Sequence, residues 1–243
     1  MAHRYFTKDI VGDTATITGP DALHLAKVLR AKPGEKLILC NGKQMDYEAE
    51  ITEVSASVVR LRVLGSYPSV AEPTIWVEAF IGYAKGERMD LAVQKAVELG
   101  AGAIRPFFSA NTVVKPAKTP ADEQKKAQRL NRIAAEAAKQ SGRGILPQVA
   151  LPMPFKQALT LANNYDVSLF LYEGGGQPLQ QVVQQQERIA IFTGAEGGFT
   201  PTEAEQAVQA GLVPVGLGPR ILRCETAPAA ALAVVMALTG NLE

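Results

Sequence analysis

The sequence predicts an α/β protein in which a small β-rich domain precedes a larger domain built on a parallel sheet. Residues 1–68 hold short alternating segments separated by turn residues, whereas strand and helix patterns alternate from residue 74 onward. Pro68 and Pro73 flank the stretch between them, which favours a linker. A chain of 243 residues with 47% hydrophobic content can fill two such cores. We therefore predict domains at residues 1–68 and 74–243.

The N-terminal domain is predicted as a small β-barrel with one short helix. Asn41-Gly42 lies between two apolar segments and predicts a hairpin turn. A helix is expected over residues 21–30, with Asp21 as its N-cap and Leu25 on its inner face. The expected strands are residues 15–18, 36–40, 47–51 and 58–64.

The C-terminal domain alternates strands and helices in the manner of a parallel sheet. Thr200, Pro201 and Glu203 predict a capping box at the start of one helix. The last helix is apolar on every side, so we expect a partner subunit to cover part of it. The expected strands are residues 75–81, 104–108, 167–171, 189–193 and 212–216, and the expected helices are residues 86–99, 121–140, 200–211 and 228–238.

Several classes of protein are disfavoured by what the sequence contains. Cys40 and Cys224 lie far apart and outside metal-ligand spacing, which favours a reducing cytoplasm and no metal. His3 and His24 are the only histidines, so no Ser-His-Asp set can be assembled, and a nucleophilic Cys224 would lack a nearby base. The N-terminus has no apolar signal region and the longest apolar run, residues 227–238, is too short to span a bilayer.

Positive charge is concentrated in one stretch of a chain whose formal net charge is only +1. Residues 115–143 carry eight Lys or Arg residues against three Asp or Glu residues. Many of them recur at helical spacing and share the outer face of the helix predicted over residues 121–140. This excess is typical of a surface that binds a polyanion, although a solvated helix face explains it equally well.

Two glycine-rich strings near the C-terminus carry most of the functional information. Residues 194–200 (GAEGGFT) and 217–227 (LGPRILRCETA) each follow a short apolar strand and precede a helix start. A third glycine turn, residues 174–176, should meet them at one edge of the parallel sheet, where α/β proteins bind ligands. Neither string has the P-loop or dinucleotide pattern, which disfavours a nucleotide-dependent oxidoreductase and favours a neutral or zwitterionic adenosine ligand.

These two strings resemble the SPOUT class of methyltransferases and, more narrowly, the 16S ribosomal RNA uracil-N3 methyltransferase family known as RsmE. The resemblance extends to residues 24–30 (HLAKVLR), 85–90 (KGERMD), 95–100 (KAVELG) and 140–143 (QSGR). The chain departs from the family pattern at Ala195, where proline is usual, and at Cys224, where threonine is usual. Residues 109–112 (SANT) also replace a more charged Ser-Glu-Arg-Ser pattern.

The resemblance implies a C-terminal trefoil knot that binds S-adenosylmethionine, an N-terminal PUA-like domain that binds RNA, and an obligate homodimer. It implies methylation of N3 of a uridine in 16S ribosomal RNA of the small subunit, in the cytoplasm, with no membrane or DNA partner. We expect the cofactor to lie against Leu171, Tyr172, Glu173, Gly194, Glu196, Gly197, Gly198, Leu217, Gly218, Ile221, Leu222 and Arg223. We expect RNA to contact Arg4, His24, Lys27, Arg30, Lys85, Arg88, Lys125, Arg129, Arg132 and Arg143.

N3 of uracil becomes a good nucleophile only after it loses its proton. Arg220 or Arg223 is the candidate for stabilising the resulting charge, and Glu225 or Glu196 is the candidate for taking the proton. Two other functions stay open. The chain can be a methyltransferase of the same class acting on a tRNA base or a ribose 2′-oxygen, or a non-catalytic RNA-binding protein that aids ribosome assembly.

Overall fold

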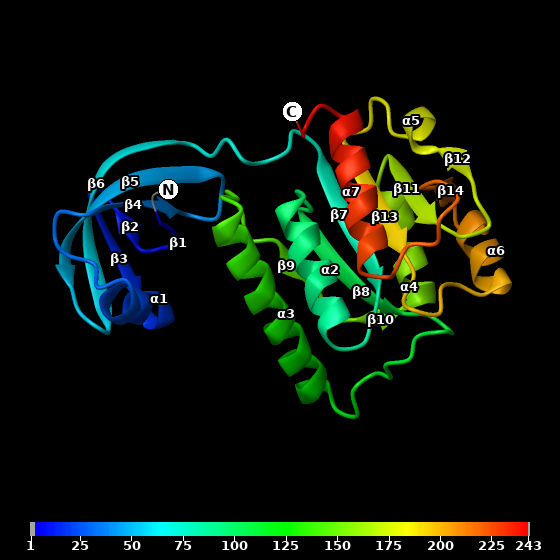
Figure 1. Ribbon diagram of the computed structural model, residues 1–243, viewed down its shortest axis with the longest axis horizontal. Helices are drawn as coiled ribbons and strands as arrows, with labels where there is room; N and C mark the ends of the chain where they lie inside the picture. The colour runs from blue at the N-terminus through cyan, green and yellow to red at the C-terminus, as the bar shows by residue number, and fades with distance from the viewer. Residues whose placement is uncertain (1–2, 243) are drawn as a thin grey trace. The chain divides into compact units, whose positions relative to one another are not determined.

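The computed structural model describes residues 3–242, which form two compact units (Figure 1). The N-terminal unit comprises the described residues up to Glu72 together with Ala138–Leu146. The C-terminal unit comprises Pro73–Ala137 and the described residues from Pro147 onward. The N-terminal unit therefore contains a segment from the middle of the chain that the sequence analysis did not assign to it.

The N-terminal unit is a curled six-stranded sheet with the strand order β1-β4-β5-β6-β3-β2 (Figure 1). The predicted hairpin at Asn41-Gly42 is present, because β4 and β5 pair antiparallel on either side of it. Alternate side chains, among them Leu39, Ile51 and Leu61, fill a core that is closed to solvent. The strands are β1 (Arg4–Phe6), β2 (Ile10–Val11), β3 (Thr14–Thr18), β4 (Lys36–Cys40), β5 (Met45–Val54) and β6 (Val58–Pro68).

The predicted helix over residues 21–30 is shorter and less regular than expected. An α-helical turn α1 (Gly19–Leu23) continues into a π-helical turn η1 (His24–Val28). Asp21 lies in the first turn rather than at the N-cap, which is Thr18. Arg30 ends the segment with a φ of +53°, a left-handed conformation that is uncommon outside glycine. Leu25 is buried as predicted.

The segment 138–146 is attached to the N-terminal unit by a buried ion pair. The Arg143 side chain is only 2% exposed and its guanidinium donates to both carboxylate oxygens of Glu72, at 2.9 and 2.8 Å. Glu72 Oε1 also accepts the backbone N–H of Gly144 at 2.6 Å. Arg4 donates to the backbone carbonyl of Arg143 and pairs with Asp46 at 2.6 Å. These arginines therefore hold the unit together.

The C-terminal unit is built on a parallel sheet, which confirms the predicted fold class. Its strand order is β10-β8-β7-β13-β11-β14-β12, and β9 also pairs with β8. Every pairing in this sheet is parallel. β13 lies between β7 and β11, although both precede it in the chain. The strands are β7 (Trp76–Gly82), β8 (Ala103–Phe108), β9 (Gln148–Val149), β10 (Met153–Pro154), β11 (Val167–Leu171), β12 (Gln177–Pro178), β13 (Arg188–Thr193) and β14 (Val213–Gly216).

Helices cover both faces of this sheet. On one face an aromatic cluster that includes Phe80, Phe107 and Phe192 packs against the segments around α4 and α6. On the other face α7 packs against β13, β7 and α2, and Figure 1 shows α2 and α7 side by side. The helices are α2 (Glu87–Glu98), α3 (Pro120–Gln140), α4 (Phe155–Thr160), the 3-10 turn η2 (Ala162–Asn164), α5 (Leu179–Val182), α6 (Pro201–Gln209) and α7 (Thr226–Leu238).

The start of α6 has the capping box that the sequence predicts. The Thr200 hydroxyl accepts the backbone N–H of Glu203, and the Glu203 carboxylate accepts the backbone N–H of Thr200 at 3.0 Å. The other Glu203 oxygen accepts the backbone N–H of Ala110 at 2.7 Å. The cap therefore also holds the turn over residues 109–112 beside the glycine-rich segment that precedes α6.

Candidate cofactor pocket and its rim

A cavity of about 590 Å³ opens at the carboxyl edge of the C-terminal sheet. Three neighbouring strands, β13, β11 and β14, end at this edge, because all three run parallel. The glycine-containing turns that follow them line the cavity together, as the sequence predicts. Every residue that we expected against the cofactor and all four catalytic candidates are among the lining residues.

Glycines allow the backbone of these turns to pack closely. A Cβ atom added at Gly82, the last residue of β7, would lie 2.3 Å from the backbone nitrogen of Ala195. A Cβ at Gly176 would lie 2.2 Å from the Pro214 carbonyl oxygen, and one at Gly197 would lie 2.7 Å from Cβ of Asn111. By contrast, Gly198, with a φ of +59°, has open space where a side chain would be. The turns therefore present backbone, rather than side chains, to a ligand.

Glu196 is the acidic side chain with the most distinctive surroundings. Its Oε1 accepts the backbone N–H of Lys85 at 2.8 Å and lies 3.4 Å from Nη1 of Arg88. Its Oε2 is buried and has no hydrogen-bond partner among the described residues. A buried carboxylate oxygen without a donor costs free energy, so this atom is suited to a positively charged or proton-donating group of a ligand.

Cys224 and Glu225 form a second polar pair in the lining. The Cys224 thiol is 7% exposed and lies 3.2 Å from Oε2 of Glu225, to which it donates. Burial and this hydrogen bond raise the pKa of Cys224 to about 12, so the thiol is protonated at neutral pH and is no nucleophile. A backbone hydrogen bond at Glu225 itself, the thiol, and the charges of Arg88 and Arg223 lower the pKa of Glu225.

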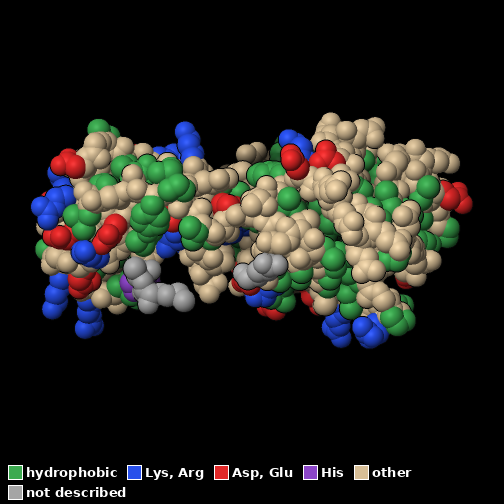
Figure 2. Space-filling model, turned by 90° about the horizontal axis from the view of Figure 1, so that it is seen from above, with side chains coloured by type: hydrophobic (Ala, Val, Ile, Leu, Met, Phe, Trp, Pro, Cys, Tyr) green, Lys and Arg blue, Asp and Glu red, His purple; other side chains and the backbone are tan. Residues whose placement is uncertain are grey.

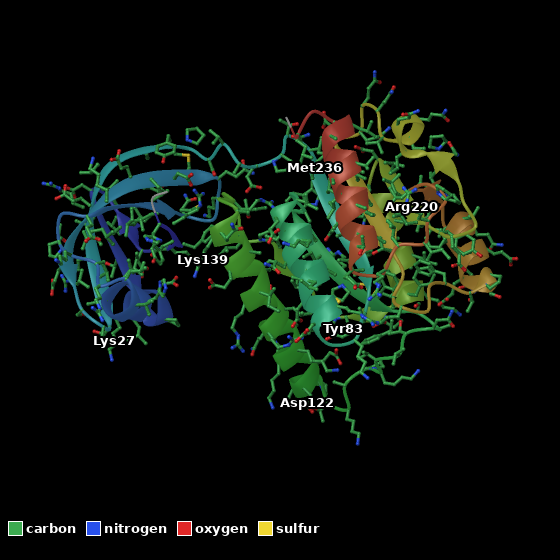
Figure 3. All side chains as sticks on the ribbon, in the orientation of Figure 1. Lys27, Tyr83, Asp122, Lys139, Arg220 and Met236 are labelled. Carbon is green, nitrogen blue, oxygen red and sulfur yellow. The ribbon has the colours of Figure 1, made fainter. Side chains whose placement is uncertain are left out.

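Arg220 and Arg223 lie in the segment that joins β14 to α7, where Figure 3 labels Arg220. Both side chains are exposed, and neither guanidinium has a hydrogen-bond or ion-pair partner among residues 3–242. Arg88, in contrast, pairs with Glu196 and lines the cavity, although the sequence analysis assigned it to RNA alone. The backbone carbonyl of Arg223 accepts the N–H groups of Thr226 and Ala227, which anchors this segment to α7.

The residues predicted to bind RNA divide into free, paired and buried groups. Lys27, Arg30, Lys85 and Arg132 are exposed, and Figure 3 labels Lys27 on the N-terminal unit. His24 is also exposed, but its Nδ1 lies 3.3 Å from the Tyr5 hydroxyl and is hydrogen-bonded to it. Figure 2 shows Lys and Arg side chains interspersed with Asp and Glu over that unit on the face that it presents. Mixed charge of this kind provides no broad single-sign field, so an RNA contact there depends on individual residues.

Arg4 and Arg143, which were predicted to bind RNA, are not exposed cations. Both are used in the ion pairs with Asp46 and Glu72, because a buried guanidinium requires a carboxylate partner. Exposed residues of α3 also have partners: Arg129 pairs with Asp90 of α2 at 2.5 Å, and Lys125 lies 3.5 Å from Asp122. The positive excess counted along residues 115–143 therefore overstates the free charge.

Asn111 is a residue of this site that the sequence analysis did not assign. Its Nδ2 donates to the backbone carbonyl of Gly197 at 2.8 Å, inside the glycine turn that lines the cavity. The neighbouring Thr112 hydroxyl accepts the backbone N–H of Ser109 at 2.9 Å, which closes the turn that carries Asn111. The sequence showed only that residues 109–112 depart from the family pattern, since nothing local connects them to Gly197.

Comparison with known proteins agrees with this geometry. A family model described as an RNA methyltransferase domain matches residues 71–236, and one described as an RNA methyltransferase PUA domain matches residues 17–64. The chain is 34% identical to ribosomal RNA small subunit methyltransferase E of Bacillus subtilis, over 96% of this chain and 95% of that protein. The chain belongs to the methyltransferase E family.

Other members of the methyltransferase E family are similar over almost the whole chain. The Synechocystis protein of that name is 32% identical, over 98% of this chain and 78% of its own length. The crystal structure of the Neisseria gonorrhoeae methyltransferase E bound to S-adenosylmethionine has a TM-score of 0.89 with 29% identity, and 98% of each chain is covered. The two-unit architecture is therefore that of the methyltransferase E family.

No helix among residues 3–242 combines the length and the apolar character needed to cross a membrane. α7 is the most apolar helix, but it has only 13 residues.

Proposed function

We propose that the protein transfers the methyl group of S-adenosylmethionine to N3 of a uridine in 16S ribosomal RNA of the small subunit. The observation that carries this proposal is the cavity, in which three turns converge at the carboxyl edge of a parallel sheet. Support also comes from the methyltransferase E of Neisseria gonorrhoeae, a relative bound to this cofactor. The activity is assigned to the cytoplasm, where small subunits are assembled.

The residues present fit S-adenosylmethionine. The backbone of the turns at Gly194, Gly198 and Gly218 provides amide and carbonyl groups for an adenosine moiety, with little side-chain bulk. The Glu173 and Glu196 carboxylates line the same cavity and complement the positive charges of the ligand. When bound, this cofactor supplies an electrophilic methyl group. The chain supplies position, because in-line displacement depends chiefly on the alignment of the reacting atoms.

The uridine must lose its N3 proton, and the structure favours Glu196 over Glu225 as the acceptor. A lowered pKa makes Glu225 a weaker base, and its Oε2 already accepts the Cys224 thiol. Glu196 retains an oxygen without a partner. Arg223, whose exposed guanidinium belongs to the lining of the same cavity, is the proposed group for stabilising the negative charge that develops on the uracil oxygens, with Arg220 as the alternative.

RNA binding is proposed for the exposed basic residues that have no internal partner. Among the residues predicted to bind RNA, those in the N-terminal unit are Lys27 and Arg30, together with the exposed His24, which is hydrogen-bonded to Tyr5. In the C-terminal unit they are Lys85 and Arg132, together with Arg220 and Arg223 of the cavity rim. Contacts of this kind to phosphates predict an affinity that falls steeply as salt increases.

We also propose that the protein is a homodimer in which α7 contributes to the interface. Leu232 and Val235 of this helix are buried against the C-terminal unit. Val234 and Leu238 remain 37% and 40% exposed on the same helix. An apolar helix that is covered on one side only is typical of a subunit interface. Sedimentation velocity of the full chain would show a single species of about 52 kDa, twice the 25.9 kDa of one chain.

The function is tested by incubating the purified protein with methyl-labelled S-adenosylmethionine, separately with small-subunit particles and with bulk tRNA. The expected result is label in 16S RNA that digests to N3-methyluridine. Label in tRNA or on a ribose oxygen would replace the proposed substrate with another RNA. Absence of any cofactor binding would support the non-catalytic assembly protein instead.

A further inference from the structure

The most exposed large apolar side chain of the C-terminal unit, among the described residues, lies on the rim of the cavity. Ile221 is 84% exposed, whereas its neighbour Leu222 is partly buried and Cys224 is buried. The segment is held at both ends, since β14 ends at Gly216 and the Arg223 carbonyl is bonded to the first turn of α7. Ile221 is therefore presented to solvent by an anchored segment, at a position where burial of an apolar group would be favourable.

The charges around Ile221 indicate what kind of molecule covers it. Arg220 and Arg223 flank it, both exposed and both without a partner in the described part of the chain. Covering Ile221 with an apolar protein surface would also remove two unpaired guanidinium groups from water, which is costly. A nucleic acid satisfies all three residues at once, because phosphates pair with arginine and aliphatic side chains can insert between neighbouring bases.

The proposed reaction requires that the base leave its stack. N3 lies on the pairing edge of uracil, so the base must leave its stack before it can reach the cavity. Proteins that unstack bases commonly insert Ile, Leu, Met or Phe between neighbouring bases. An apolar side chain beside the cavity mouth, with a cation on either side, has the properties needed for this role.

We propose that Ile221 is a wedge that occupies the space left by the displaced uridine, while Arg220 holds an adjacent phosphate. This inference rests on the proposed function, because it deepens the description of how the same cavity receives its RNA substrate. Ile221 is a positioning residue rather than a catalytic one. Ile221 is among the residues that line the cofactor cavity, and its side chain is 84% exposed.

The test compares Ile221→Ser with Ile221→Leu, and uses small-subunit particles that lack the methyl group as the substrate. Ile221→Ser should lower kcat/KM for the particles at least tenfold, because serine cannot replace base stacking. Ile221→Leu should restore kcat/KM to within about threefold of the wild type, since leucine also wedges. Val208→Ser, a matched change at an exposed apolar residue of α6 outside the cavity, is the control and should be neutral.

Two further measurements separate this role from the alternatives. Because Ile221 lines the cavity, the dissociation constant for S-adenosylmethionine is measured alongside activity: in Ile221→Ser, kcat/KM for the particles should fall by a much larger factor than cofactor affinity, and the sedimentation coefficient should be unchanged. The slope of log affinity for RNA against log salt should be unchanged in Ile221→Ser but reduced by about 0.7 to 1 in Arg220→Ala. If Ile221 had no contact with RNA, every measurement on Ile221→Ser would match the wild type, and only Arg220→Ala would change the salt slope.

The proposal is overturned if Ile221→Ser retains wild-type kcat/KM, or if cofactor affinity falls by the same factor as activity. It is also overturned if the variant sediments as a smaller species, because Ile221 would then belong to a subunit interface. If the wild-type protein binds cofactor but methylates no RNA, the proposed function fails and the wedge fails with it. The methylation assay on the wild-type protein is sufficient to distinguish this outcome from a failure of the wedge alone.

Discussion

The close approach of Gly82 to the first glycine turn gives the sharpest test of how the fold shapes the cavity. A Cβ at Gly82 would lie 2.3 Å from the Ala195 nitrogen and 2.7 Å from the Gly194 carbonyl carbon. Ordinary contact begins at 3.4 Å, so Gly82→Ala requires these backbone atoms to separate by about 1.1 Å. No flexible side chain is available to absorb this movement, because the clash is with backbone.

The displacement has two expected consequences of different size. Overpacking should lower the free energy of unfolding by about 1–3 kcal/mol, which outweighs the gain of about 0.4–1 kcal/mol from replacing glycine in the unfolded chain. A shift of about 1 Å in groups that position reactants can lower turnover about a hundredfold. Function should therefore suffer far more than stability, since Gly194 and Ala195 line the cavity.

The assay combines calorimetric titration with S-adenosylmethionine, methyl transfer to small-subunit particles, and thermal unfolding. Gly65→Ala in β6 is the matched control, because a Cβ there meets nothing within 4 Å and the residue has no positive φ. Gly82→Ala should lose cofactor affinity at least tenfold while keeping wild-type far-ultraviolet circular dichroism. Cofactor affinity and turnover within twofold of the wild type would refute the reasoning that this contact sets the shape of the cavity.

Three further predictions concern single buried groups. Arg143→Met should destabilise the N-terminal unit by about 3–5 kcal/mol in urea unfolding, because Glu72 is left buried without its cation. The control is Lys36→Met, which removes an exposed ion pair and should leave the urea midpoint of unfolding unchanged. The Cys224 thiol, whose pKa rises from 9.0 to about 12, should react with iodoacetamide at pH 8 roughly a thousandfold more slowly than the same thiol in urea; equal rates would contradict its burial. The Thr193 side chain is buried and its hydroxyl has no hydrogen-bond partner among the described residues. Thr193→Val should therefore raise the free energy of unfolding by about 1 kcal/mol. A decrease in the free energy of unfolding would show that the hydroxyl has a partner.

The raised pKa of Cys224 also contributes to the dependence of stability on pH. The folded chain holds this proton more tightly than the unfolded chain, whose thiol has the ordinary value of 9.0. The contribution is therefore fully present below pH 9 and is lost as pH rises from about 9 to about 12. Chemical unfolding at pH 8 and pH 10 should show a larger loss of stability in the wild type than in Cys224→Ala. An equal loss would show that the thiol titrates normally in the folded chain.

The sequence was sufficient for five strands of the parallel sheet, β7, β8, β11, β13 and β14, because each is a short apolar run between turn or cap residues, whereas the two-residue strands β9, β10 and β12 were not predicted. The cavity was also predictable, since parallel strands bring the turns after Leu171, Thr193 and Gly216 to one edge. Insertion of β13 between β7 and β11 was not predictable, because strand order depends on contacts far apart in the chain. The trefoil knot stays a prediction, which this strand order supports.

Buried polar partners could not be predicted from the sequence either, because they too are contacts between residues far apart in the chain. Glu78 lies in the apolar strand β7 and is 5% exposed, yet it pairs with Arg105 at 2.7 Å and accepts the Tyr165 hydroxyl. Nothing in a local pattern connects these three residues. Arg143 shows the opposite failure, in which a basic residue in a basic stretch is predicted to face RNA but is used inside the fold. Charge counts along a chain cannot distinguish the two outcomes.

Cofactor binding and RNA binding should be separable by mutation, because different kinds of group carry them. The cofactor side consists of backbone turns locked by close contacts at Gly82, Gly176 and Gly197, so changes there should alter cofactor affinity and leave the salt dependence of RNA binding intact. The RNA side consists of exposed cations without internal partners, and removing one costs no folding contact.

Glu196 is the exception, since it bonds Lys85 and Arg88 through one oxygen and presents the other without a partner. Glu196→Gln should therefore impair both cofactor binding and turnover, and a variant that loses turnover alone would identify this carboxylate as the proton acceptor.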